Sequence, residues 1–200
     1  VLCPPFEAFR VLSCEAFVAQ VLCGALGAKA VFCGPNFTFG SGRAGDAHLL
    51  RKLCAARGIE VHVVPLACWQ GQVVSSTRIR AALAQGDMPA VNAMLAQPYA
   101  VSLPVRHGRG NGRQWGFPTI NQVYPGGLLV PREGVYISRV TLADGTVHPG
   151  ATGLGSRPTV NNDAADVTCE TFLPGFSGDV YGEAARLVLC RYLWPTRKFD

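Results

Sequence analysis

The sequence predicts an α/β region followed by an all-β region. Helix and strand signals alternate up to about residue 97, which indicates a parallel sheet. After Pro98, short alternating apolar segments are separated by Gly, Pro, Asn and Asp, a pattern typical of a small antiparallel barrel or sandwich. We therefore place a domain boundary at Gln97-Pro98 and expect two domains, 1–97 and 98–200.

The elements of the first half follow one another in a clear order. Ser13, Asp46 and either Ser75 or Ser76 can cap helices at their N-termini, and Gly58 closes the second helix. The predicted elements are helices at 13–26, 46–58, 75–86 and 87–97 and strands at 30–33 and 59–64. In the second half, strands are predicted at about 99–106, 134–142, 146–152, 167–173 and 185–193.

The composition excludes some classes of protein. In 200 residues that are 48% hydrophobic, no apolar run approaches the roughly 20 residues of a membrane span. The formal net charge of +5 suits anionic small molecules and does not require nucleic acid. We therefore expect neither a membrane nor a nucleic acid as a partner.

The cysteines indicate a reducing compartment. None of the 8 cysteines shows C-x-x-C spacing, so we expect free thiols in the cytoplasm. Because Val1 and Asp200 do not resemble natural ends, we expect a fragment of a longer chain.

The segment from His107 to Asn121 carries the strongest functional signal. Its glycines let backbone N–H groups approach a ligand closely, and its arginines are planar donors suited to phosphate oxygens. The residues concerned are Gly108, Arg109, Gly110, Gly112, Arg113 and Gly116. Thr119 and Asn121 lie on one side of an extended chain and offer two neutral oxygens to a cation. Phosphate and magnesium are the expected ligands, and an RNA-contacting loop is the alternative.

The first half contains a second candidate phosphate site. Ser75, Ser76, Thr77, Arg78 and Arg80 place hydroxyls and guanidiniums at the start of a predicted helix, where free N–H groups favour anions. A glycine-rich loop at 34–46 follows a predicted strand, which is where open α/β sheets bind ligands. The two loops together suggest a nucleotide crevice. The alternative is a serine cap followed by surface arginines.

Several ordered motifs resemble the bacterial bifunctional riboflavin kinase/FAD synthetase family. In the first half they are Pro5-Phe6 through Phe17-Val18, Gly34-Pro-Asn-Phe-Thr-Phe-Gly40 and Ser75-Ser-Thr-Arg-Ile-Arg80. In the second half they are Gly116-Phe-Pro-Thr-Ile-Asn121, Gly134-Val-Tyr136, Gly155-Ser-Arg-Pro-Thr159, Glu170-Thr171 and Asp179-Val-Tyr-Gly182. The resemblance implies a partial Rossmann-like nucleotidyltransferase domain, followed by a small Greek-key β-barrel that lacks its C-terminal helix.

The resemblance also assigns roles in riboflavin phosphorylation. The glycine loop would cover the phosphates of the co-substrate ATP, using Gly108, Arg109, Gly112, Arg113, Gly116, Pro118 and Thr119. Thr119 and Asn121 would hold Mg²⁺. Glu170 would be the catalytic base, and a solvent-facing strand glutamate is the alternative. The expected small-molecule partners are riboflavin, FMN and ATP.

The adenylyltransferase roles fall on fewer residues. The resemblance assigns nucleotide binding to Asn36, Gly40, Ser75, Ser76, Thr77, Arg78 and Arg80. Asn36 replaces a usual Asp, and the early Gly-x-Phe-Asp and His-x-Gly-His-type motifs have no counterpart in the chain. We therefore expect this chain to be impaired in converting FMN to FAD.

Other departures bear on the flavin site. Phe172 replaces a frequent His, and Leu193-Trp-Pro-Thr196 replaces a usual Leu-Arg-Pro-Glu. Trp194 could stack on an aromatic ligand or shield the barrel. Two alternatives to a kinase remain: a flavin or nucleotide binder without turnover, and a platform for single-stranded nucleic acid.

Overall fold

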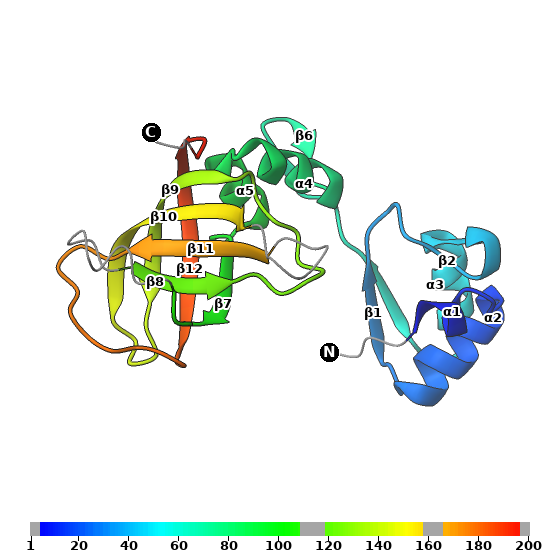
Figure 1. Ribbon diagram of the computed structural model, residues 1–200. Coiled ribbons are helices and arrows are strands. Elements are labelled where there is room, and N and C mark those ends of the chain that lie inside the picture. The colour runs from blue at the N-terminus through cyan, green and yellow to red at the C-terminus, as the bar shows by residue number, and fades with distance from the viewer. Residues whose placement is uncertain (1–4, 109–118, 158–165, 197–200) are drawn as a thin grey trace. The chain divides into compact units, whose positions relative to one another are not determined.

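The computed structural model describes residues 5–108, 119–157 and 166–196 (Figure 1). Its contacts divide the chain into two compact units, Val1–Val73 and Val74–Asp200. Each unit is considered by itself. Within the described ranges, no helix is both long and apolar enough to cross a membrane.

The first unit is an α/β structure with a short parallel sheet. Strand β1 (Ala30–Cys33) pairs in parallel with β4 (Glu60–Val63). Its helices are α1 (Phe6–Phe9), α2 (Cys14–Ala16), the π-helix η1 (Phe17–Ala25), the 3₁₀ helix η2 (Ser41–Arg43) and α3 (Ala47–Ala55). Ser13 and Asp46 cap α2 and α3 as predicted, because their side chains accept hydrogen bonds from Ala16 N and Leu49 N.

Two hairpins in this unit were not predicted. Strands β2 (Thr38–Phe39) and β3 (Gly45–Asp46) pair within the glycine-rich loop, and β5 (Cys68–Trp69) pairs with β6 (Gln72–Val73). Each strand has only two residues, too few to show an alternating pattern. The second hairpin turns through Gln70 and Gly71, which both have positive φ, as a type I′ turn requires.

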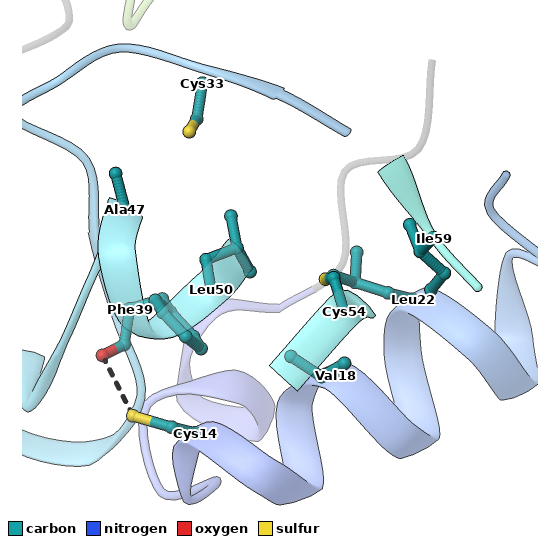
Figure 2. Close-up of a cluster of buried hydrophobic side chains, with 9 residues drawn as sticks. All are labelled: Cys14, Val18, Leu22, Cys33, Phe39, Ala47, Leu50, Cys54 and Ile59. Atoms are coloured by element: carbon teal, nitrogen blue, oxygen red, sulfur yellow. Dashed lines mark hydrogen bonds between the residues drawn. The ribbon is translucent and has the colours of Figure 1, made fainter. Parts of the chain in front are cut away.

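The core of the first unit lies between its helices and one face of the sheet (Figure 2). It combines aliphatic side chains from η1 and α3 with buried thiols: Cys14, Val18, Leu22, Cys33, Phe39, Ala47, Leu50, Cys54 and Ile59. Burial raises the pKa of the Cys54 thiol above its ordinary value. The described cysteines are free thiols.

The second unit is a nearly closed antiparallel barrel with two helices. Its strand order is β7 (Ala100–Pro104), β12 (Ala184–Trp194), β9 (Gly134–Thr141), β10 (Val147–Arg157), β11 (Asp166–Phe172) and β8 (Thr119–Val123). A backbone hydrogen bond of 2.7 Å from Arg106 N to Asn121 O brings the two ends of the sheet together. The barrel class predicted for the second half is therefore confirmed.

Several polar side chains in the barrel interior form hydrogen bonds across strands. Gln122 Nε2 donates to the carbonyls of Leu103 and Ala185, both at 2.8 Å, and so joins β8 to β7 and β12. The Thr152 hydroxyl donates to Ser138 Oγ at 2.7 Å. Gln122, Ser138 and Thr152 therefore point into the barrel, and their neighbours along β8, β9 and β10 point outward.

Helices α4 (Ser76–Gln85) and α5 (Met88–Leu95) pack with the barrel. Arg132 N donates to Leu83 O at 3.0 Å, and Asn92 Nδ2 donates to Leu189 O at 3.5 Å. These contacts explain why the compact unit begins at Val74, before α4. The boundary at Gln97-Pro98 remains a prediction about where the two sequence regions meet.

Candidate active site on the outer face of the barrel

Five strands contribute one residue each to a row across the outer face of the barrel. The register pairs Asn121 with Glu170, Glu170 with Gly153, Gly153 with Val135, and Val135 with Trp194. Directly paired residues of antiparallel strands point to the same face, so these side chains share one surface. We call Asn121, Glu170, Gly153, Val135 and Trp194 the central row.

The central row brings together two residues that the sequence singled out. Asn121 of β8 and Glu170 of β11 are direct cross-strand partners, and both are half-buried. Direct partners have Cβ atoms about 5 Å apart, so an amide and a carboxylate can act on the same ligand. Cys169 and Thr171, on either side of Glu170 along β11, point into the barrel and are buried.

A neighbouring row lies one pleat away. Thr119 pairs with Phe172, which pairs with Ala151. Thr119 therefore lies on the same face as Asn121, as the two-residue spacing predicted, because β8 is an extended strand.

Gly108 lies directly against Asn121. A Cβ atom at position 108 would come within 2.5 Å of Asn121 Nδ2 and 2.8 Å of Oδ1, closer than real Cβ contacts. Asn121 Nδ2 also donates to Thr119 O at 3.4 Å, so the amide oxygen is the atom it can offer to a ligand. The absence of a side chain at Gly108 thus determines where this amide sits.

Thr119 and Asn121 are the candidate donors for the magnesium expected from the sequence. Among the described residues, no group of three or more His, Cys, Asp or Glu side chains could hold a metal ion. Mg²⁺ bound to a nucleotide needs only a few protein oxygens, because phosphates and water supply the rest. The Thr119 and Asn121 oxygens therefore fit a nucleotide-borne ion.

A pocket of about 260 Å³ opens beside Thr119. Its lining residues come from β8, from Val105 and from the segment after β11: Val105, Thr119, Ile120, Leu173, Phe176, Ser177, Gly178, Val180 and Tyr181. The His107 ring stacks on the Tyr181 ring, with centroids 3.7 Å apart. The pocket is apolar, flanked by aromatic rings, and suited to a planar group.

Three other side chains can now be assigned. Tyr136 is buried in the core, and its hydroxyl donates to Arg132 O. Burial raises the pKa of Tyr136 to about 12 and that of the Cys169 thiol to about 12. Asp179 Oδ1 accepts a 3.1 Å hydrogen bond from Tyr181 N, so this side chain stabilises the turn.

Several predicted ligands of the kinase loop fall in 109–118. Arg109, Gly112, Arg113, Gly116 and Pro118 lie outside the described residues, so their roles stay predictions. Sequence reasoning missed Phe176 and Val180 as pocket residues. A turn that joins distant strands carries no periodic signal, and only the resemblance at 179–182 pointed to this region.

The candidate adenylyltransferase residues lie in two compact units. Asn36 and Gly40 belong to the first unit and Ser75 to Arg80 to the second. Gly40 has φ 78°, and a Cβ there would meet Cys14 Sγ at 2.5 Å. The backbone conformation and the packing therefore both require glycine at this position, whether or not it binds a nucleotide. Ser75 Oγ accepts from Arg78 N at 3.3 Å and caps α4, while Ser76, Thr77 and Arg80 are exposed.

Comparisons with known proteins agree with the motifs. Residues 95–200 match the family model described as riboflavin kinase, and residues 1–78 match the model described as FAD synthetase. The chain is 34% identical to a bifunctional riboflavin kinase/FMN adenylyltransferase from Pseudomonas fluorescens, over 100% of this chain and 63% of that protein. A protein of the same description from Bacillus subtilis (strain 168) is 31% identical over 97% of this chain and 61% of its own length.

A solved structure supports the fold. The crystal structure of a macrolide-efflux protein from Streptococcus pneumoniae superposes with a TM-score of 0.84 at 28% identity, covering 96% of this chain and 60% of that chain. By sequence, the chain spans 63% of the length of the Pseudomonas relative. The resemblance drawn from the motifs is confirmed by the family matches.

Proposed function

The chain belongs to the riboflavin kinase family, and from that premise we propose that it transfers the γ-phosphoryl group of ATP to riboflavin, giving FMN and ADP. The observation that carries the proposal is the direct pairing of Glu170 with Asn121 on the outer face of the barrel. A carboxylate next to a metal-compatible amide, beside an apolar pocket, suits a reaction that depends on positioning and charge neutralisation.

Glu170 is the proposed general base. The 5′-hydroxyl oxygen of riboflavin forms a bond to the γ-phosphorus, and the bond from that phosphorus to the oxygen bridging to the β-phosphate breaks. The hydroxyl proton passes to the Glu170 carboxylate, and ADP leaves. A positioned base of this kind contributes about 10²- to 10⁴-fold to the rate.

Thr119 and Asn121 are the proposed protein ligands of Mg²⁺. When bound, the ion neutralises negative charge on the transferred phosphoryl group. Gly108 keeps the Asn121 amide in place by leaving room for it. Arg109, Gly112, Arg113, Gly116 and Pro118 are proposed to surround the phosphates.

The pocket beside Thr119 is the proposed site of the nucleotide base. It is lined by Thr119, Phe176 and Tyr181, and its 260 Å³ suits part of a small ligand. Since Thr119 lies in both the pocket and the neighbouring row, a nucleotide there would extend its phosphates toward Asn121. Riboflavin would then approach Glu170 from the β10 side.

The match to the FAD synthetase model supports a second proposed function, adenylylation of FMN. Asn36, Gly40, Ser75, Ser76, Thr77, Arg78 and Arg80 would bind that nucleotide. Formation of FAD from FMN and ATP is the measurement that tests it. The double variant Arg78→Ala/Arg80→Ala should abolish any FAD formed and leave FMN formation unchanged.

Riboflavin phosphorylation is tested by incubating the protein with riboflavin, ATP and Mg²⁺ and separating flavins by chromatography. We expect FMN from the wild type, and strong losses in Glu170→Gln and Asn121→Ala. Glu183→Gln, which replaces an exposed carboxylate elsewhere on the barrel, is the control. Full activity in both site variants would show that the site is wrongly assigned.

The two alternatives give different results in the same assay. A binder without turnover quenches riboflavin fluorescence but yields no FMN with ATP and magnesium. A nucleic-acid platform shows oligonucleotide affinity that falls steeply with salt, and no response to riboflavin.

A further inference from the structure

Trp194 lies at the far end of the central row from Asn121. It pairs with Val135, which pairs with Gly153, which pairs with Glu170. Three strand spacings separate Glu170 from Trp194, roughly 14 Å along the sheet. The indole is 52% exposed, although it is one of the largest apolar groups in the chain.

A backbone irregularity directs Trp194 outward. The register of β12 against β9 shifts between Tyr192 and Trp194, which is a β-bulge. Before the bulge, the Tyr192 ring packs edge-on against Tyr136 of the core, with centroids 5.3 Å apart. Bulges change the face to which a side chain points, so Trp194 joins the outer face although it is two residues from Tyr192.

Between Glu170 and the Val135–Trp194 pair, the surface of β10 carries almost no side chain. Its outward residues here are Ala151, Gly153 and Gly155. A Cβ atom at Gly153 would have only Glu170 O within 4 Å, at 3.9 Å. The space above this strand is therefore open, with the carboxylate on one side and the indole on the other.

A second apolar side chain borders the same space. Ile137 pairs with Ala151 and is 46% exposed, one pleat from Val135. Trp194 and Ile137 thus form an exposed apolar edge on the far side of β10 from Glu170, and the exposed Arg191 is paired with Ile137. A flat ligand with one apolar and one hydroxylated part fits this arrangement, with its apolar part at the indole.

We propose that Trp194 is a positioning residue that stacks on the isoalloxazine ring of riboflavin. This inference rests on the proposed riboflavin kinase function. The ring lies over Gly153 against the indole, and the ribityl chain runs back along the central row toward the Glu170 carboxylate. Aromatic stacking adds binding energy beyond that of the buried area, so Trp194 increases the affinity for riboflavin. Because the indole contacts the flavin ring and not the nucleotide, the affinity for ATP does not depend on it.

The first test separates riboflavin binding from chemistry. In Trp194→Ala, we expect the KM for riboflavin to rise about tenfold, with kcat changed less than about threefold and the KM for ATP unchanged. Trp194→Phe, which keeps an aromatic ring, should restore most of the affinity. Val147→Ala, which trims a side chain 56% exposed on the same face of β10, is the control and should match the wild type.

The second test uses an independent position. Gly153→Val fills the open space without altering Trp194 and should also raise the KM for riboflavin about tenfold while sparing that for ATP. Riboflavin should quench tryptophan emission more in the wild type than in Trp194→Phe.

The outcomes separate this inference from the proposed function. If the wild type makes FMN and Trp194→Ala keeps its riboflavin KM within twofold, Trp194 does not position the ring and the kinase assignment stands. If the wild type neither makes FMN nor responds to riboflavin, both fall together.

Discussion

The barrel and the N-terminal region both carry residues expected to bind a nucleotide, but they hold them in different ways. In the barrel, Asn121 and Glu170 are direct partners in one hydrogen-bonded sheet. In the other case, Asn36 and Gly40 belong to the first compact unit and Ser75 to Arg80 to the second. Strand register fixes the geometry of the first site, whereas the residues assigned to the second are divided between the two compact units.

The two units also differ in the size of the sheet that carries the candidate residues. The first unit has a parallel sheet of only two strands, β1 and β4, whose exposed face includes Phe32. The second has a six-stranded sheet whose largely apolar interior also holds polar side chains that are hydrogen-bonded across strands. We expect the kinase site to be rigid by itself, and changes in one unit to leave the other largely unaffected.

The largest effect on FMN formation should come from a substitution in the barrel site, and a substitution in the first unit should have little effect. Glu170→Gln should lower the rate of FMN formation about 10²- to 10⁴-fold, because it removes the proton acceptor while keeping the shape. Asn36→Ala, in the first unit, should change that rate less than about twofold. Comparable losses in both variants, measured by flavin chromatography, would mean that the kinase site is not confined to the barrel.

The next effect concerns the stability of the barrel. Gln122→Leu removes both 2.8 Å hydrogen bonds to Leu103 O and Ala185 O and leaves two carbonyls without their donor. We expect a loss of about 2–4 kcal/mol in the free energy of unfolding of this unit. Hydrogen exchange should accelerate in β7 and β12 but not in β1 and β4. Gln20→Leu, on an exposed helix position of the first unit, is the control.

A smaller effect tests the packing of Gly108 against Asn121. In Gly108→Ala, the new methyl group must displace the Asn121 amide, so the magnesium requirement should rise and kcat should fall about tenfold, or about 1.4 kcal/mol. Gly126→Ala is the matched control, because a Cβ there would meet nothing within 4 Å. Equal activity of the two variants across a magnesium titration would show that Gly108 does not position the Asn121 amide.

The smallest effect compares equivalent helix caps in the two units. Asp46 caps α3 of the first unit and Ser75 caps α4 of the second, each by accepting a backbone N–H. Replacing either with alanine should cost about 1 kcal/mol. Region-resolved hydrogen exchange should place each loss in its own unit. A loss that spreads across both units would contradict their independence.

Much of this architecture could be predicted from the sequence, because it depends on local signals. The caps at Ser13 and Asp46 and the long strands β9 and β12 have strong patterns, and the structure contains them. Strand β8 was not assigned as a strand, because Thr119–Val123 follows a glycine-rich stretch whose composition suggests a loop. The packing of α4 and α5 against the barrel was also missed, since amphipathic helices do not encode which surface they cover.

For the site, residue types were predictable and their spatial relations were not. Thr119 and Asn121 were identified as a pair by their spacing, and Glu170 by resemblance. Their arrangement in one row follows from the register of β8, β11 and β10, which no local pattern specifies. The position of Trp194 depends on a bulge, and the pocket beside Tyr181 depends on a turn between distant strands.

Glu170 and Asn121 are proposed to form the reaction centre of a riboflavin kinase. The most direct measurement is a single-turnover phosphoryl transfer from labelled ATP to riboflavin, with the Kd for riboflavin determined in parallel. We expect Glu170→Gln to bind riboflavin within about twofold of the wild type but to transfer the phosphoryl group at least about 100-fold more slowly. Transfer at the wild-type rate by this variant would contradict it.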